Sequence, residues 1–253
     1  MRKLLLASAA MVALGGPALA ADAVPPPPVP APPVVAAPAP TFDWTGPYVG
    51  FYAGYGFGYS AATGTTPGAF DEGVAGLTLP VDPRGVLGGV TVGYNQQAGA
   101  FVFGVEGTGG YLNLNGTNAL TGGGDVNATL DDDTGTVNYG WYGTVAARLG
   151  VAMDRTLLFA TAGGIVTQFS SVYGDLDGAL DAADATVLGG PQFGYVLGGG
   201  AEFAFDTNWT AKLEYNYFNL GTDTTGNNTP GDAFSQRNSA HLVRFGLNYL
   251  FNY

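Results

Sequence analysis

The stretch that decides the fold is residues 245–253, which read FGLNYLFNY and end the chain. Every second residue in it is large and apolar or aromatic: Phe245, Leu247, Tyr249, Phe251 and Tyr253. This alternation predicts a β-strand with one apolar face. A soluble domain rarely ends on an exposed strand of this kind, because its edge would associate with other strands. In an outer-membrane β-barrel, lipid covers the apolar face and the first strand closes the edge, so the ending predicts both a fold and a compartment.

Residues 1–20 predict a cleaved secretory signal peptide. Arg2 and Lys3 supply positive charge, residues 4–14 are apolar, and residues 18–20 read Ala-Leu-Ala, a small-x-small cleavage site. The alternative is a short membrane anchor, but the apolar run is shorter than the ~20 residues that a spanning helix needs. The mature chain is therefore expected to begin at Ala21.

Residues 21–43 form a second predicted segment, a proline-rich periplasmic tether. They hold nine of the sixteen prolines and no aromatic residue before Phe42. Such a segment favours an extended polyproline-like conformation over a helix or a core. Two roles stay open for it, contact with peptidoglycan or service as a plain disordered linker. Residues 44–253 are then the predicted barrel domain.

Composition excludes several classes of function. The expected mature chain has twenty acidic and six basic residues, a net charge of −14, which argues against nucleic-acid binding because that needs a basic footprint. Cysteine is absent, so disulfides, thiolate metal sites and lipid attachment at an N-terminal cysteine are excluded. Charged residues make up only 11% of the chain, which suits a barrel whose outer wall faces lipid better than a large soluble domain.

Eight segments have the alternation or composition of strands: residues 48–60, 86–95, 100–111, 138–151, 156–167, 192–205, 209–220 and 240–251. The faces of the fifth segment stay unassigned, because it alternates poorly. Short connections alternate with long ones, the long ones being residues 61–85, 112–137, 168–191 and 221–239. Short periplasmic turns and long extracellular loops are typical of transmembrane barrels. The prediction is an all-β fold, an eight-stranded antiparallel up-and-down barrel with both mature termini in the periplasm.

The predicted outward face carries two aromatic belts, as both interfaces of a spanning barrel should. One lies near the short turns: Tyr94, Phe101, Phe103, Phe203, Phe205, Trp209, Tyr249 and Phe251. The other lies near the long loops: Phe57, Tyr59, Tyr111, Tyr139, Trp141, Tyr195 and Tyr217. The alternative is a soluble lipocalin-like barrel, which would bury its apolar face and expose charge. Here the opposite face is mostly glycine, small or charged residues.

Six charged residues fall on the predicted inward face: Glu106, Arg148, Glu202, Lys212, Glu214 and Arg244. Each lies within about seven residues of the short-turn end of its strand, so we expect them at similar heights, paired across the lumen. Buried charges that stay unpaired cost several kcal/mol. This lumen charge network is interpreted as a plug that holds the barrel's shape. The alternatives are a narrow ion path that opens when the pairs rearrange, and catalysis by Glu202 and Glu214, which a packed lumen disfavours because no substrate could enter.

The long loops are acidic, and one contains Asp131, Asp132 and Asp133 in a row. Clustered carboxylates are a weak candidate for a divalent-cation site, because their spacing matches no defined calcium loop. Solvated surface loops are the simpler interpretation. His241, the single histidine, should point outward near the outer interface. No enzyme and no cofactor is expected.

Several motifs resemble, in order, those of the outer membrane immunogenic protein family, the porin-like small barrels of Gram-negative bacteria. The opening Trp44-Thr45-Gly46-Pro47-Tyr48-Val49-Gly50 resembles that family's "W-T-G-x-Y-V-G". Others are Gly104-Val105-Glu106, Arg148-Leu149-Gly150, Leu157-Leu158-Phe159, Gly200-Ala201-Glu202, residues 213–217 and residues 243–249. The ending Asn252-Tyr253 departs from the aromatic-x-Phe ending usual in the family. The resemblance implies an eight-stranded outer-membrane barrel, with roles ranging from envelope integrity and surface antigenicity to adhesion, haem binding and weak pore activity.

The residues and the resemblance together predict a non-enzymatic protein of the outer membrane of a Gram-negative bacterium, structural or exposed as a surface antigen, with extracellular loops. The alternative is a narrow porin for ions or small solutes. Expected partners are outer-membrane lipids and lipopolysaccharide. The C-terminal strand also resembles the signal that the barrel insertion machinery reads.

Overall fold

The structure, a computed structural model, describes residues 42–65, 78–119, 134–174, 186–226 and 233–251. The chain divides into two units, Met1–Ala39 and Pro40–Tyr253, and all described residues belong to the second. The predicted signal peptide, the tether up to residue 41, Asp131–Asp133 and Tyr253 lie outside the described residues. Within the described ranges, no helix is long and apolar enough to cross a bilayer.

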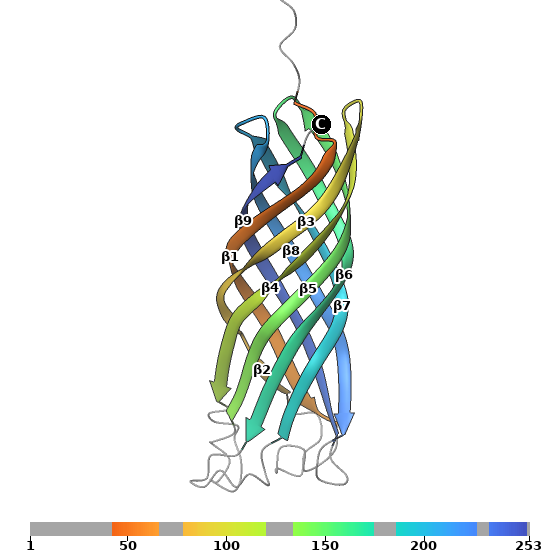
Figure 1. The fold of residues 1–253 in the computed structure, drawn as a ribbon. Coiled ribbons are helices and arrows are strands. Elements are labelled where there is room, and N and C mark those ends of the chain that lie inside the picture. Colours follow the sequence, from red (N-terminus) through yellow and green to blue (C-terminus); the bar gives the residue numbers. More distant parts are fainter. Residues whose placement is uncertain (1–41, 66–77, 120–133, 175–185, 227–232, 252–253) are drawn as a thin grey trace, which may run out of the picture. The chain divides into compact units, whose positions relative to one another are not determined.

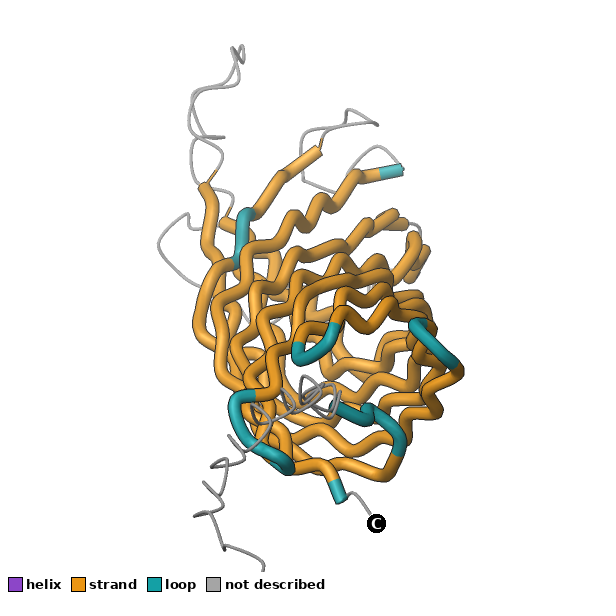
Figure 2. The backbone as a smooth tube through the Cα atoms, turned by 90° about the horizontal axis from the view of Figure 1, so that it is seen from above, coloured by secondary structure: helices purple, strands orange, loops and turns teal. Residues whose placement is uncertain are grey.

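Eight long antiparallel strands form a closed barrel, so the predicted fold class is confirmed (Figure 1, Figure 2). They are β1 (Gly46–Gly64), β3 (Arg84–Ala98), β4 (Phe101–Ala119), β5 (Thr134–Met153), β6 (Thr156–Gly174), β7 (Thr186–Ala204), β8 (Trp209–Gly226) and β9 (Ala233–Leu250). Each strand pairs with the next along the chain, and β9 returns to pair with β1. The C-terminal stretch closes the barrel, since its register on β1 runs from Tyr48 opposite Leu250 to Gly64 opposite Phe234.

A ninth, short strand was not predicted. β2 (Thr78–Val81) pairs with Ser60–Thr63 at the far end of β1, while β3 pairs with Gly46–Phe57 at the near end. Asp82 and Pro83 interrupt the wall between the two, and the Pro83 carbonyl accepts a hydrogen bond of 2.8 Å from the Gly58 amide. β2 and β3 therefore act as one wall element with a break, which sequence alternation did not reveal because it spans only four residues.

The strands are longer than predicted, and most of the added length lies toward the long connections. A membrane needs about 9–11 residues of a tilted strand, whereas these strands have 15–20. The outward residues of β4 turn polar after Tyr111, so the apolar alternation stops while the strand continues. Leu112, Leu114 and Val137, which fall in the predicted connection 112–137, are fully buried inside the barrel.

Large apolar side chains point outward along the part of the wall nearer the short turns, as predicted for lipid contact. Phe51, Val90 and Phe245, for example, are all more than half exposed.

Tyr139 is an exception, because the sequence predicts it in an outward belt, whereas it is only 2% exposed and faces the lumen. The pairing of β5 with β6 shifts between Tyr139 and Tyr142. Such a bulge reverses the face of the residues beyond it, and period-two reasoning cannot see it.

The lumen is filled in layers rather than lined by charge alone. The apolar cluster nearer the long connections, called the upper cluster although that end is drawn at the bottom of Figure 1, includes Leu87, Leu112, Tyr142, Phe169 and Phe218. The cluster nearer the short turns, called the lower cluster, includes Trp44, Tyr48, Leu157, Phe159 and Leu250. β6 contributes inward residues to both clusters, which explains why its faces could not be assigned. On this strand the inward and outward sides are both apolar over much of its length.

Candidate functional site

The six charged residues predicted for the lumen lie together between the two apolar clusters. Their exposed fractions are 1–5%, so water is nearly excluded from all of them. Glu106 comes from β4, Arg148 from β5, Glu202 from β7, Lys212 and Glu214 from β8, and Arg244 from β9. Five of the eight wall strands thus converge on one layer.

Strand register accounts for one of the ion pairs, Glu214 with Arg244, and brings Glu202 and Lys212 close together without pairing them. Glu202 on β7 is directly opposite Lys212 on β8, and Glu214 on β8 is directly opposite Arg244 on β9. Opposite residues of antiparallel strands have Cβ atoms about 4.5–5.5 Å apart on the same face. Opposite charges on neighbouring strands are therefore held within reach of each other by the backbone.

Four ion pairs join the six residues into two groups, Arg148 with Glu202 and Glu106–Lys212–Glu214–Arg244, and the Tyr48 hydroxyl links the groups by hydrogen bonds with Arg148 and Glu106. Arg148 pairs with Glu202. The Lys212 ammonium lies 2.9 Å from a Glu106 oxygen and 3.2 Å from a Glu214 oxygen. The same Glu214 oxygen lies 2.9 Å from the Arg244 guanidinium. Three acids face three bases, so the layer carries no net formal charge.

Neutral side chains add hydrogen bonds to two of the three carboxylates, those of Glu106 and Glu202. The Tyr48 hydroxyl donates to Glu106 over 2.7 Å. Glu202 accepts hydrogen bonds from the Thr210 hydroxyl at 2.5 Å and from the Asn248 amide at 2.7 Å. Extra hydrogen bonds are what a buried ion pair needs, because Coulomb attraction alone often fails to offset desolvation.

Aromatic rings cover two of the guanidinium groups. Arg148 lies 3.9 Å from the centroid of the Phe159 ring, and Arg244 lies 4.9 Å from that of Tyr52. Cation–π contacts of this kind contribute up to about 2 kcal/mol when desolvated. Phe159 belongs to the lower apolar cluster and Tyr52 to the upper one, so each ring joins the charged layer to a neighbouring layer.

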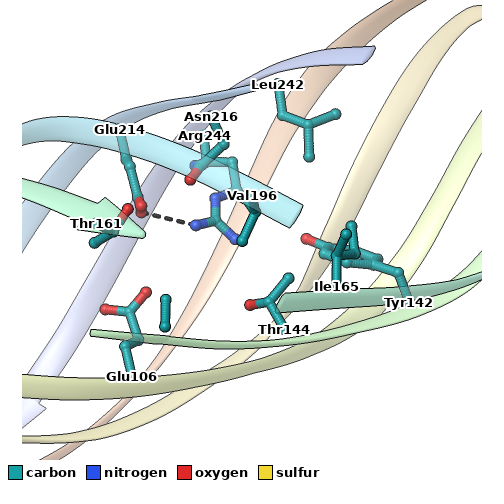
Figure 3. Close-up of a pocket in the computed structure, with 11 residues that line it drawn as sticks. Glu106, Tyr142, Thr144, Thr161, Ile165, Val196, Glu214, Asn216, Leu242 and Arg244 are labelled. Atoms are coloured by element: carbon teal, nitrogen blue, oxygen red, sulfur yellow. Dashed lines mark ion pairs between the residues drawn. The ribbon is translucent and has the colours of Figure 1, made fainter. Parts of the chain in front are cut away.

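A small cavity lies against the charged layer (Figure 3). It is lined by Glu106, Glu214 and Arg244 on its polar side and by Ile165, Val196 and Leu242 on its apolar side. Its volume, measured as the space open to the centre of a water molecule, is about 10 Å³. That is room for about one water molecule, not for a substrate.

Phe42 and Trp44, at the junction of the predicted tether and the predicted barrel domain, pack into the lumen at its short-turn end. Trp44 is 1% exposed and its ring packs edge-on against Phe42 at 4.8 Å between centroids. The Trp44 amide donates to the Gln97 side chain over 2.9 Å, and the Gln97 amide donates to the Thr45 hydroxyl over 3.1 Å. Residues 42–45 are called the lower cap below: Trp44, predicted in the barrel domain, and Phe42, predicted in the tether, both belong to the barrel's core.

A polar layer above the upper apolar cluster was missed by sequence reasoning. The Ser60 hydroxyl donates to Asn238 over 2.7 Å, and the Gln236 amide donates to Ser60 over 3.1 Å. The Ser171 hydroxyl donates to Gln236 over 3.2 Å. Gln236 and Asn238 continue the inward alternation of Arg244 and Leu242, so extending the last strand backwards would have found them.

The alternative of a catalytic pair concerned Glu202 and Glu214. Glu202 is held by Arg148, and Glu214 by Lys212 and Arg244. The cavity beside Glu214 is too small for a substrate.

His241 lies on the outward side of the barrel. Its ring stacks on Phe57 with 5.2 Å between ring centroids, and it hydrogen-bonds the Tyr215 hydroxyl over 2.5 Å. Among the described residues, no group of three or more His, Cys, Asp or Glu side chains could hold a metal ion. Asp131–Asp133 are outside that set.

Comparison with known proteins agrees with this architecture. The chain is 36% identical over 258 residues to the 31 kDa outer-membrane immunogenic protein of Brucella melitensis, covering 99% of this chain and all of the relative. It is 32% identical to a 22 kDa outer membrane protein of Rhizobium leguminosarum, over 66% of this chain and 67% of that protein. No protein-family model matches the chain.

Among solved structures, the outer membrane protein OprG of Pseudomonas aeruginosa aligns with a TM-score of 0.51. The two share 12% sequence identity, over 83% of this chain and 99% of OprG. At this identity the likeness concerns the fold alone.

Proposed function

Because the chain belongs to the outer-membrane immunogenic protein family, we propose that it is a closed, non-enzymatic barrel that stabilises the outer membrane and presents its long loops at the cell surface. The observation that carries the proposal is the filled lumen. Six paired charges lie between two apolar clusters, and the cavity beside them has room for about one water molecule. A filled lumen supports a function carried out by the outer wall and the loops, rather than the transport of ions or solutes through the barrel.

The proposed orientation follows from the two ends of the barrel. β1 begins and β9 ends at the edge that carries the short turns (Figure 1). The predicted signal peptide and tether precede β1, so the chain reaches the barrel from the periplasm, and this suits a periplasmic position for that edge. The long connections at the other edge then face outward, and the relatives' description as immunogenic supports the same placement.

Epitope tags test this orientation and surface role. One tag is inserted within residues 120–133 and a matched tag at Gly99, in the turn between β3 and β4. Intact cells should bind antibody only through the first tag, and both tags should bind after permeabilisation. Antibody binding to the Gly99 tag on intact cells would contradict the orientation.

Deletion of the gene tests the role in envelope integrity. The deletion strain should be more sensitive to detergents, and unchanged sensitivity would contradict that role.

A loop deletion tests whether the envelope role depends on the wall or on the loop. The deletion should span residues 120–133, because the predicted loop 112–137 contains the buried Leu112, Leu114 and Val137. The shortened chain should fold and restore detergent resistance in the deletion strain. Failure of a folded, shortened chain to restore resistance would move the envelope role from the wall to that loop.

A narrow porin is the second candidate, and the cavity against Glu106, Glu214 and Arg244 is the observation that favours it. Conduction would require these pairs to rearrange and the upper cluster, which includes Leu87 and Phe218, to part. Conductance measurements distinguish this candidate from the closed barrel.

A further inference from the structure

The exposed bases near the long connections lie in one sector of the outer wall. Of the six bases in the described residues, three are buried in the lumen, and Arg155 lies in the turn between β5 and β6. The other two, Arg84 on β3 and Arg237 on β9, are exposed toward the end that carries the long connections. Since β3 and β9 are the long strands that pair with β1, both bases lie beside the same strand.

The strand register gives the spacing of these two bases. Arg84 is opposite Phe57 of β1, and Arg237 is opposite Ala61, four residues further along. A strand rises about 3.3 Å per residue and neighbouring strands lie about 4.8 Å apart, so the two backbones are separated by about 13 Å along the strands and about 10 Å across them. Barrel strands are tilted by about 35–45° (Figure 1), so much of this separation runs around the wall. The spacing suits two anionic groups on one molecule better than a single one.

Both bases lie where the lipid-facing surface ends. Toward the long connections, the outward residues of β9 change from the apolar Val243 through His241 to Arg237. Phe57 and Tyr59 of β1, which are 44% and 45% exposed, lie between the two bases. Aromatic belts of membrane proteins lie at the level of the headgroups. A ligand in this sector would therefore be a headgroup rather than an acyl chain.

Neither base is neutralised by the protein. Arg84 and Arg237 have no ion pair and no side-chain hydrogen bond with another described residue, whereas the three bases of the lumen are all paired. A surface hollow of about 450 Å³ adjoins Arg84, and Asp82 lies in it as well. The hollow gives a ligand room to contact Arg84, while Asp82 opposes a negative charge there.

We propose that this sector binds the phosphorylated disaccharide of lipopolysaccharide, with Arg84 and Arg237 each taking one of its two phosphates. The planar donors of a guanidinium match phosphate oxygens, and phosphates at the two ends of a disaccharide suit two bases that a strand separates. A phospholipid headgroup with one phosphate satisfies only one of them. The inference rests on the proposed orientation, which places this end of the wall in the extracellular leaflet, where lipopolysaccharide forms the membrane.

Native mass spectrometry of the mature chain, refolded in detergent, tests this assignment. The protein is titrated with bisphosphorylated lipid A, with the monophosphorylated form that carries the same acyl chains, and with phosphatidylglycerol. The bisphosphorylated form should bind at least tenfold more tightly than either of the others. Equal binding of the monophosphorylated form would overturn the site with two bases, and equal binding of phosphatidylglycerol would reduce it to non-specific lipid contact.

Substitutions assign the two ends of the site. Arg84→Gln and Arg237→Gln should each weaken binding of bisphosphorylated lipid A at least tenfold and abolish its preference over the monophosphorylated form. Asp82→Asn should tighten binding, because it removes the opposing charge beside Arg84. The control is Arg155→Gln, which removes an exposed base at the short-turn end and should change nothing. Unchanged binding in folded Arg84 and Arg237 variants would refute the site.

Gel mobility with and without boiling verifies that each variant is folded. Binding in detergent does not depend on orientation, so its failure, when the tag within residues 120–133 is exposed on intact cells, would refute the site and leave the proposed function intact. Antibody binding to the Gly99 tag on intact cells would instead overturn the orientation and, with it, lipopolysaccharide as the occupant.

Discussion

Each charge in the lumen is held by at least one opposite charge, and substitution of Arg148, Glu202, Lys212 or Glu214 leaves another buried charge without an ion pair. Glu214 illustrates this best, because the same carboxylate oxygen contacts both Lys212 and Arg244. Removing one partner of a buried pair is strongly destabilising, typically by about 3–5 kcal/mol.

Glu214→Gln should therefore lower the free energy of unfolding by about 3–5 kcal/mol, since it keeps the side chain's shape and removes its charge. Urea titration of the refolded barrel in detergent, followed by tryptophan fluorescence, measures the shift. Asp223→Asn is the matched control on the same strand, because Asp223 is exposed and should change stability by less than about 0.5 kcal/mol. Equal shifts in the two variants would mean that the ion pairs do not hold the barrel.

Trp44 makes a second prediction at the scale of one residue. Replacing a buried large aromatic by alanine costs about 3–5 kcal/mol, so Trp44→Ala should lower the temperature at which the folded gel band disappears. Trp209→Ala serves as control, because Trp209 is 38% exposed on the outer wall and should shift that temperature less. A larger shift for Trp209 would mean that the lower cap is not part of the core.

At the scale of single strands, glycines admit the aromatic rings of the lumen. A Cβ on Gly93 of β3 would lie 2.4 Å from the Tyr48 ring, whereas one on Gly109 of β4 would have no atom within 4 Å. Tyr48 in turn donates to Glu106. The Gly93 position is therefore fixed by the ring that lies over it.

Gly93→Ala should destabilise the barrel by about 1–3 kcal/mol, because it displaces Tyr48 and weakens the contact with Glu106. Gly109→Ala should have little effect in the same urea titration. The two substitutions add the same methyl group, so intrinsic strand preference cancels. A Gly109 variant as unstable as the Gly93 variant would contradict this role of the ring.

Strand positions could be predicted from sequence as far as lipid imposes alternation, and no further. The end of β9 at Leu250 was found within one residue, since Phe245 to Phe251 alternate strictly. The alternation predicts that β4 ends at Tyr111, whereas the strand continues to Ala119. The prediction stops early because the outward residues beyond the membrane are polar. Tyr139 was placed on the wrong face because a bulge changes the period without a mark in composition.

At the scale of the whole molecule, the six lumen charges could be selected from sequence because charge on an inward face is rare. Their pairing partners could not, since only Glu214 and Arg244 are opposite each other on neighbouring strands, while the other pairs join strands that are not neighbours or residues of one strand. The apolar clusters above and below were missed because an inward leucine such as Leu157 looks like an outward one when both faces are apolar.

The closed lumen is the central claim for the molecule as a whole, and single-channel recording tests it most directly. The mature chain is refolded in detergent, its closed barrel is verified by gel mobility before and after boiling, and the same sample is added to planar lipid bilayers. We predict a folded barrel that adds no unitary conductance steps to the bilayer. Reproducible steps that change in Glu106→Ala or Arg148→Ala variants would contradict the closed barrel and make the lumen charges the lining of a narrow pore.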